Sequence, residues 1–162
     1  MPWADSGIDH VVCALSAGRE SSWHAKYPAC LTHRPDAVVN AVRTIMRDRA
    51  RPALFHCAAG KDRTGVIAAL LLDVLGVADA TIVADYVLTD HALADILARL
   101  RQAGPYVRML ADSTDEDQRP LAEAMQSFLD WFHEHGGAAA WLTLRGVPSE
   151  EIEAFRADLI EP

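Results

Sequence analysis

The sequence predicts an α/β fold with a partial parallel sheet and a predominantly helical C-terminal portion. Two observations carry this prediction. A short apolar run, residues 53–55, precedes a polar loop that contains glycine, and an almost uniformly apolar segment, residues 66–75, follows that loop. A buried strand, a loop and a buried helix in this order are typical of α/β proteins. The length of 162 residues and the 51% hydrophobic content fit one domain over residues 1–162.

The first half of the chain contains one clear helical pattern. Residues 1–26 mix Gly, Ser, His and Trp without a period, so we expect an irregular lead-in. From Pro35, apolar residues recur at helical spacing until Arg51-Pro52, which predicts an amphipathic helix. Residues 53–55 then read as a buried strand, and residues 66–75 as a buried central helix that ends at Gly76.

Beyond the central segment the pattern predicts helices only. They span residues 79–86, 91–103, 120–135 and 149–160, and the first two are separate helices or one bent helix. Gly104-Pro105 ends the second, and the polar, acidic stretch 112–120 reads as a surface loop. Ser149 is the expected N-cap of the last helix.

Charge and hydropathy exclude several classes of function. A net charge of -8 repels nucleic acid and anionic membranes, so we expect neither as a partner. The longest apolar run, residues 66–72, is far shorter than the roughly 20 residues that cross a bilayer, so no stable membrane insertion is expected. Residues 1–10 lack the pattern of a signal peptide, which predicts a cytoplasmic protein.

The cysteines argue against a disulfide framework and against a metal site. Cys13, Cys30 and Cys57 are few and odd in number, which suits a reducing compartment. No pair has C-x-x-C spacing, and His133 and His135 project from different faces of a helix, so we expect no metal. Cys13 or Cys30 is a possible disulfide partner for an oxidised Cys57, although sequence does not reveal proximity.

The residues best suited to chemistry lie in the segment HCAAGKDRTG, from His56 to Gly65. A loop that closes onto a helix N-terminus points its backbone N–H groups inward and forms a nest for a tetrahedral dianion such as phosphate. Gly60 and Gly65 permit a close approach of the ligand. The expected phosphate-binding residues are Ala58, Ala59, Gly60, Lys61, Asp62, Arg63 and Thr64.

Cys57 is the expected nucleophile. The helix N-terminus and Arg63 favour its thiolate, so it should titrate well below the free-thiol value of about 8.5. Arg63 offers a planar fork to two phosphate oxygens, and Thr64 can donate its hydroxyl to the sulfur. The predicted reaction is attack of Cys57 on a phosphate ester, followed by hydrolysis of the cysteinyl phosphate by water, with no cofactor.

The proton donor for the leaving oxygen is less well determined. Asp62 is favoured because the loop holds it beside the nucleophile, with a structural role in bonding loop amides as the alternative. Asp36, Asp85 and Asp90 remain candidates, although Asp36 equally suits the first turn of its helix. His56 is expected to be a hydrogen-bonded supporting residue rather than a proton shuttle.

Three further features allow two interpretations each. Lys61 is either a ligand contact or part of a solvated rim. Tyr86 is a core residue more readily than a substrate contact. Residues 93–110 form either a helical lid over the pocket or ordinary packing.

The motif HCAAGKDRTG resembles the signature of the bacterial tyrosine and lipid phosphatases, which are cysteine-dependent phosphatases with an H-C-x-x-G-K-D-R motif. Residues 66–77, 84–89 and 146–151 are also similar to that family, so the resemblance covers roughly residues 27–162. It implies that Cys57 is the nucleophile, Arg63 the phosphate clamp, Asp62 the acid and base, and Lys61 an extra contact for phosphate or an inositol head group. The implied substrates are phosphotyrosine proteins, sometimes phosphoserine or phosphothreonine proteins, and often phosphoinositides.

Two departures from the family pattern define the competing hypothesis. Residues 1–26 do not match the Arg-Asp-Leu-Gly-Gly-type segment and the strands with which longer relatives begin, so the chain looks N-terminally short. The acid loop Trp-Pro-Asp of eukaryotic tyrosine phosphatases is absent, and residues 2–5 have the wrong order. The alternative function is a phosphate-binding or assembly module without turnover. An incomplete sheet would also favour a homodimer.

Overall fold

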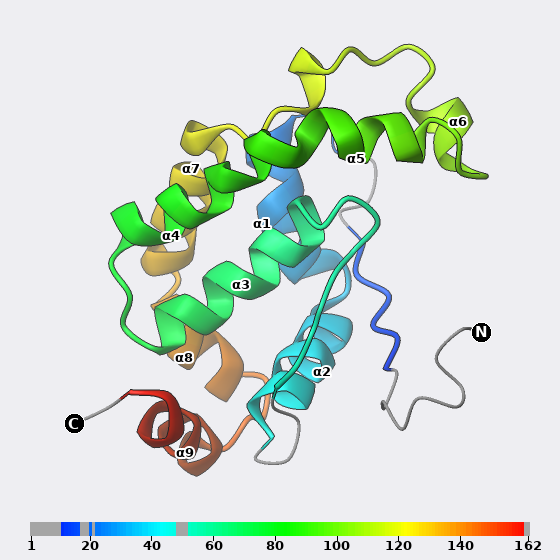
Figure 1. Cartoon of the computed structure of the whole chain (residues 1–162). Coiled ribbons are helices and arrows are strands. Elements are labelled where there is room, and N and C mark those ends of the chain that lie inside the picture. Colours follow the sequence, from blue (N-terminus) through cyan, green and yellow to red (C-terminus); the bar gives the residue numbers. More distant parts are fainter. Residues whose placement is uncertain (1–10, 17–19, 21, 48–51, 161–162) are drawn as a thin grey trace.

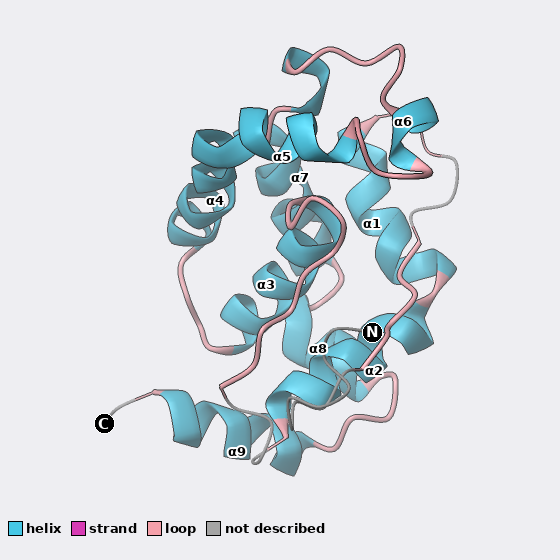
Figure 2. Cartoon of the chain, turned by 45° about the vertical axis from the view of Figure 1, so that its right-hand side comes forward, coloured by secondary structure: helices cyan, strands magenta, loops and turns pink. Residues whose placement is uncertain are grey.

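All regular elements of the structure are helices. This computed structural model describes residues 11–16, 20, 22–47 and 52–160, and the lead-in residues 2–5 lie outside those ranges. No residue within them belongs to a strand (Figures 1 and 2). The prediction of an α/β fold with a partial parallel sheet is therefore wrong for the described chain.

The predicted strand at residues 53–55 is an extended loop segment with no strand beside it among the described residues. It runs along the outside of the helices toward the motif of residues 56–65 (Figure 1), and its Leu54 is 89% exposed. Residues 53–56 make no backbone–backbone hydrogen bond with another described residue. A lone strand is not stable, because its backbone groups need a second strand as partner. The prediction of a buried strand is therefore wrong: Leu54 is exposed, and only Phe55 of this run packs partly against the core.

Helices, not a sheet, cover the central helix α3 (Asp62–Val74). Its residues Val66, Leu70 and Val74 are fully buried. The helices packed around it are α1 (Trp23–His33), α2 (Pro35–Met46), α4 (Asp79–Val87) and α8 (Gly137–Thr143). Residues 66–75 are thus buried by other helices of the same chain.

The remaining helices complete the shell around this core. They are the 3₁₀ helix η2 (Leu88–Ala92), α5 (Leu93–Leu100), α6 (Tyr106–Met109), the 3₁₀ helix η3 (Glu116–Gln118), α7 (Ala122–Glu134) and α9 (Ser149–Leu159). The predicted C-terminal helices therefore agree with the structure to within a few residues. Ser149 begins α9 without a capping hydrogen bond, so its predicted N-cap role is wrong. No described helix has the length and apolar character needed to span a bilayer.

The helices α1 and α8 were not predicted, and neither were the short α6 and η3. The helix α1 overlaps the expected irregular lead-in, and its Ser22 cap accepts a hydrogen bond from Ala25 N at 3.3 Å. Pro28 inside this helix obscured the pattern, because proline normally ends a helix. The spacing of Tyr27, Cys30 and Leu31, which are all buried, is nevertheless helical. The helix α8 begins directly after Gly136, which adopts a left-handed conformation.

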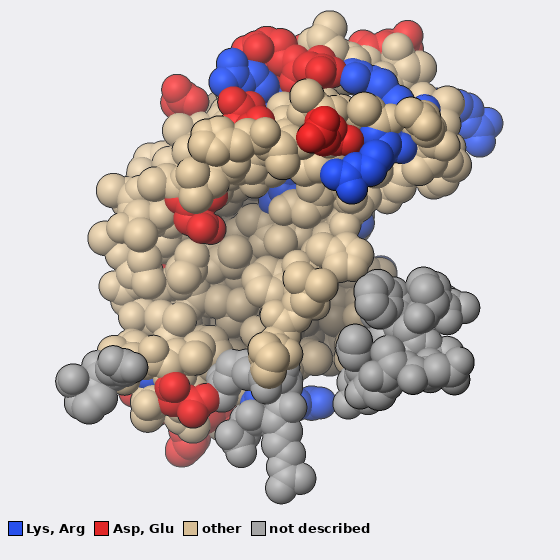
Figure 3. All heavy atoms as spheres, in the orientation of Figure 1, with Lys and Arg blue, Asp and Glu red and all other residues tan. Residues whose placement is uncertain are grey.

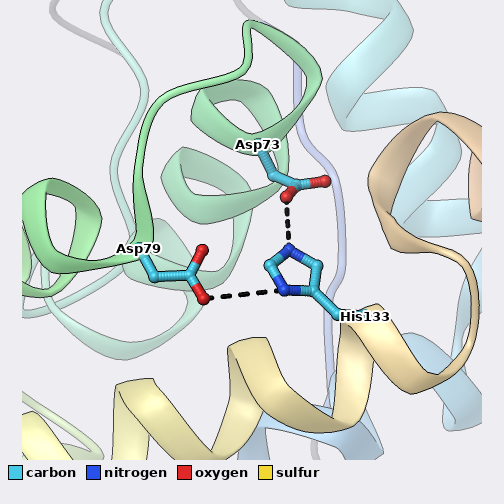
Figure 4. A group of neighbouring side chains, drawn as sticks. All are labelled: Asp73, Asp79 and His133. Atoms are coloured by element: carbon cyan, nitrogen blue, oxygen red, sulfur yellow. Dashed lines mark hydrogen bonds and ion pairs between the residues drawn. The ribbon is translucent and has the colours of Figure 1, made fainter.

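A histidine between two carboxylates joins the ends of three helices (Figure 4). His133, in the last turn of α7, lies 2.7 Å from Asp73 Oδ1 through Nε2 and 3.5 Å from Asp79 Oδ2 through Nδ1. The other Asp73 oxygen accepts from Ala138 N at 2.7 Å, so the same carboxylate also holds the start of α8. The hydrogen bond to Asp73 raises the pKa of His133 above its usual value, against the effect of burial.

We expect His133→Gln to lower the melting temperature by about 2–3 °C at pH 6, and by much less at pH 9. Because the folded-state pKa of His133 is raised, the stabilisation is complete below the usual pKa of about 6.5 and disappears as pH rises through the folded-state value. The side chain is 43% exposed, so solvent screening limits the effect to about 0.5–1 kcal/mol. Thermal unfolding of wild type, His133→Gln and the exposed control His91→Gln checks this; equal losses at both pH values would contradict it.

Candidate active site

The motif of residues 56–65 turns from the extended segment at residues 53–55 into the N-terminus of α3. Gly60 occupies the left-handed region at φ 68°, where other residues are strained. Gly65 donates from its backbone to Lys61 O at 2.6 Å. A Cβ on Gly65 would lie 3.0 Å from Cδ2 of Tyr86. Gly65 therefore permits α4 to approach α3, a role different from the predicted approach of the ligand.

Cys57 and Thr64 form a reciprocal pair across the loop. Cys57 N donates to Thr64 Oγ1 at 2.8 Å, which leaves the hydroxyl hydrogen for the sulfur. Burial raises the pKa of the Cys57 thiol, but hydrogen bonds from the Thr64 side chain and backbone, the charge of Arg63 and the Lys61 amide outweigh it. The net result is a pKa below the usual value, as expected for a nucleophilic thiol.

Arg63 lies in the first turn of α3, close enough to Cys57 for its charge to favour the thiolate. Among the described residues no carboxylate is ion-paired with its guanidinium. Its planar donors are thus available to an anionic ligand.

Asp62 anchors the loop to two other helices. Its Oδ1 accepts from Tyr27 OH of α1 at 3.0 Å and from Lys61 Nζ at 2.5 Å. Tyr27 OH also forms a short hydrogen bond with Tyr86 OH of α4. Burial raises the pKa of both phenols, so they remain neutral donors. Both donors to Asp62 use one oxygen, and no described residue bonds to Oδ2.

Lys61 is buried, with only 2% of the residue exposed, so it does not form a solvated rim. Its ammonium lies 4.1 Å from the ring centroid of Trp23 in α1, besides its ion pair with Asp62. Sequence analysis missed Trp23 and Tyr27 as neighbours of the motif. No local pattern reveals them, because both lie more than thirty residues before Lys61 in the chain. Tyr86 is 5% exposed, in agreement with its expected core position.

The other proposed proton donors are placed differently. Asp36 and Asp85 are exposed on α2 and α4. Asp90 is ion-paired with Arg119 at 2.7 Å. His56 Nδ1 lies 2.8 Å from Cys57 O, which accepts only, so this nitrogen carries the hydrogen. His56 therefore supports the loop backbone from an exposed position.

Cys30 of α1 is buried near the motif. Burial raises the pKa of this thiol to about 11, and the nearby charges of Arg63, Asp62 and Cys57 also act on it. Cys13, Cys30 and Cys57 are all free thiols. Cys13 accepts a weak hydrogen bond from Asn40 Nδ2 at 3.5 Å.

A cavity of about 170 Å³ adjoins the loop. It is lined by Ala58, Ala59, Ile96, Arg99 and Leu100, so helix α5 forms its outer wall. Figures 1 and 2 both place the tip of the loop beneath α5. In Figure 3, charged side chains gather along the upper edge, over α5 and the segment after it, whereas the face below is mainly uncharged.

The group best able to hold a metal ion lies elsewhere. Ligand atoms of Asp73, Asp79 and His133 lie within 4.8 Å of one another, beside a second cavity of about 350 Å³. Both ring nitrogens of His133 already face a carboxylate, which describes a protonated histidine between two anions. These contacts explain the group as an ion-pair triad.

The comparisons with known proteins all point to one family. The chain matches the profile of the tyrosine phosphatase family over residues 14–161. It is similar to a tyrosine-protein phosphatase of Nostoc commune, 32% identical over 139 residues, which are 82% of this chain and 47% of that protein. It is also similar to the triple specificity protein phosphatase PtpB of Mycobacterium tuberculosis, 44% identical over 52 residues, 32% of this chain and 19% of the relative. The chain spans about half the length of the Nostoc relative.

Proposed function

Because this chain belongs to the tyrosine phosphatase family, we propose that it hydrolyses phosphotyrosine in proteins through a cysteinyl-phosphate intermediate on Cys57. One observation carries the proposal: the Cys57 thiol has a lowered pKa and lies in a loop that ends at the N-terminus of α3. A thiolate beside inward-pointing amides is suited to attack on a bound phosphate.

The reaction has two steps. Cys57 Sγ attacks phosphorus, the bond to the ester oxygen breaks, and the leaving oxygen takes the proton that the Asp62 carboxyl carries on Oδ2, the oxygen without a described partner. Water then attacks the cysteinyl phosphate, Asp62 accepts its proton, and the thiolate leaves with release of phosphate. The Arg63 guanidinium and the loop amides bind the non-bridging oxygens throughout.

The test is rapid-quench kinetics with a phosphotyrosine peptide and with p-nitrophenyl phosphate. We expect a burst of leaving group that is stoichiometric with protein, and a phosphorylated protein that is absent from Cys57→Ser. The same assay with phosphoserine peptides, phosphothreonine peptides and phosphoinositide vesicles ranks the substrate classes. These additional substrates are included because one relative is named a triple specificity protein phosphatase. Absence of the phosphorylated species during turnover would contradict the covalent mechanism.

Asp62→Asn is expected to reduce kcat about 100-fold for phosphotyrosine, but only a fewfold for p-nitrophenyl phosphate. The tyrosyl oxygen leaves poorly without a proton, whereas p-nitrophenolate leaves unaided. The amide Oδ1 can still accept from Tyr27 and Lys61, which preserves the anchor. The measurement is kcat for both substrates together with the melting temperature. Equal losses for both substrates would instead indicate a purely structural role.

A second function, phosphate binding without turnover, is favoured by the extended segment before Cys57. Residues 53–56 have no described backbone partner, although they lead directly to the nucleophile. Under this alternative, wild-type protein binds phosphate or vanadate but gives neither burst nor turnover. The quench experiment therefore decides between the two functions. We also propose a cytoplasmic location, consistent with free thiols.

A further inference from the structure

The cavity beside the loop is placed to receive the group that carries the phosphate. Ala58 and Ala59 follow Cys57 directly in the loop, and they line the cavity opposite Ile96 and Leu100 of α5. We expect a phosphoryl group held by the loop amides to place its ester group in this space, with helix α5 as the opposite wall.

The size and chemistry of the cavity favour an aromatic ring. Its volume of about 170 Å³ is close to the ~150 Å³ that holds a benzene molecule in an apolar cavity. Four of the five lining side chains are hydrocarbon. The hydrocarbon walls can pack against the faces of a tyrosyl ring. The hydroxyl groups of an inositol ring would find partners only at the open side of the cavity, where Arg99 lies.

The remaining lining residue, Arg99, carries the only charge of the five. Its side chain is exposed, and its Nε donates to Asp95 O at 3.3 Å. Among the described residues no carboxylate is ion-paired with it. By contrast, Arg101 pairs with Asp115 at 2.6 Å and Arg119 pairs with Asp90 at 2.7 Å. No hydrogen bond or ion pair joins the terminal guanidinium nitrogens of Arg99 to another described residue, and the side chain lies at the rim of the cavity.

We propose that Arg99 is a specificity-determining residue that binds an acidic side chain next to the phosphotyrosine of a protein substrate. The inference rests on the proposed function, because it names the substrate class of the same site. The net charge of -8 repels acidic peptides at long range, so recognition of a carboxylate must come from such a local cation. Arginine suits this role because its fork binds a carboxylate with two hydrogen bonds.

Binding to the Cys57→Ser protein tests the inference without requiring turnover. Two fluorescent phosphotyrosine peptides are compared, one with glutamate on both sides of the phosphotyrosine and one with glutamine there. We expect the acidic peptide to bind about threefold to fivefold more tightly at low salt, as for an exposed ion pair. Added Arg99→Gln should bring the ratio to about one, and Arg99→Lys should restore part of it.

Arg108→Gln is the matched control, because Arg108 is an exposed arginine on α6 that does not line the cavity. This variant loses the same charge and should keep the ratio. An unchanged ratio in Arg99→Gln, an equal loss in Arg108→Gln, or no peptide binding would overturn the inference. So would Arg99-dependent binding of a soluble inositol bisphosphate in place of the peptide. Melting temperatures show that each variant is folded.

Turnover of p-nitrophenyl phosphate by the wild-type chain tests the proposed phosphatase activity separately from the proposed role of Arg99. Cys57-dependent turnover without an Arg99-dependent ratio overturns the role of Arg99 and leaves the phosphatase proposal standing. An Arg99-dependent ratio without turnover has the opposite meaning: the recognition site is then present in a protein that does not catalyse hydrolysis.

Discussion

Cys57→Ser is expected to reduce the turnover of p-nitrophenyl phosphate at least about 10⁴-fold, while the protein stays folded and still binds phosphate. The loop stabilises a thiolate through Thr64, Arg63 and the Lys61 amide. A serine hydroxyl at the same place remains protonated at neutral pH, and these contacts cannot make it a comparable nucleophile. Steady-state assays and calorimetric phosphate binding are the measurements.

The matched control for this variant is Cys13→Ser. Cys13 is also a free, half-buried thiol, but its contact is with Asn40. We expect it to keep nearly full activity. If Cys57→Ser retained more than about one hundredth of wild-type turnover, another group would have to be the nucleophile.

Arg63→Lys has the second largest expected effect, a loss of about 10²–10³ in kcat/KM. Lysine keeps the positive charge but replaces the planar fork by a single ammonium, so two phosphate oxygens no longer bind in parallel. The charge that favours the Cys57 thiolate is retained. Alkylation of Cys57 by iodoacetamide should therefore keep nearly its wild-type pH profile while catalysis falls.

An unchanged alkylation profile together with reduced catalysis would show that Arg63 acts on the substrate through the shape of its guanidinium and on Cys57 through its charge. Arg43→Lys serves as the control, because Arg43 pairs with Glu151 of α9 at 2.5 Å, remote in sequence from the motif. Unimpaired catalysis in Arg63→Lys would show that a point charge suffices. A large shift of the alkylation profile would show that the guanidinium shape itself governs the thiol.

The sequence predicted the local parts of the site because their geometry is local. The pairing of Cys57 with Thr64 and the placement of Arg63 depend on ten consecutive residues that join a loop to a helix. The contacts of Lys61 and Asp62 were not predictable, since Trp23 and Tyr27 come from a distant helix. Lys61 therefore appeared to have only a ligand or solvent as partner, whereas it lies buried.

The sheet was the main error of fold prediction, and its cause is instructive. A helix satisfies its backbone within one segment, so periodicity alone located α2, α3, α7 and α9 closely. A strand depends on a second segment that the pattern at residues 53–55 does not specify. The hydrophobicity of Leu54 and Phe55 predicted burial, but Leu54 is almost fully exposed.

The two segments that meet at the Cys57 loop differ in local stability: residues 53–56 lack described backbone partners, whereas α3 is a buried helix. Amide hydrogens at residues 53–56 have no described carbonyl partner and should exchange freely with solvent. Those of α3 lie in a buried helix. Cys57, the proposed nucleophile, stands at the boundary, where its own amide is held by Thr64. Hydrogen exchange measured residue by residue should therefore change from fast to slow at the first residue of the loop, and a substitution that loosens residues 53–56 need not change the helix content.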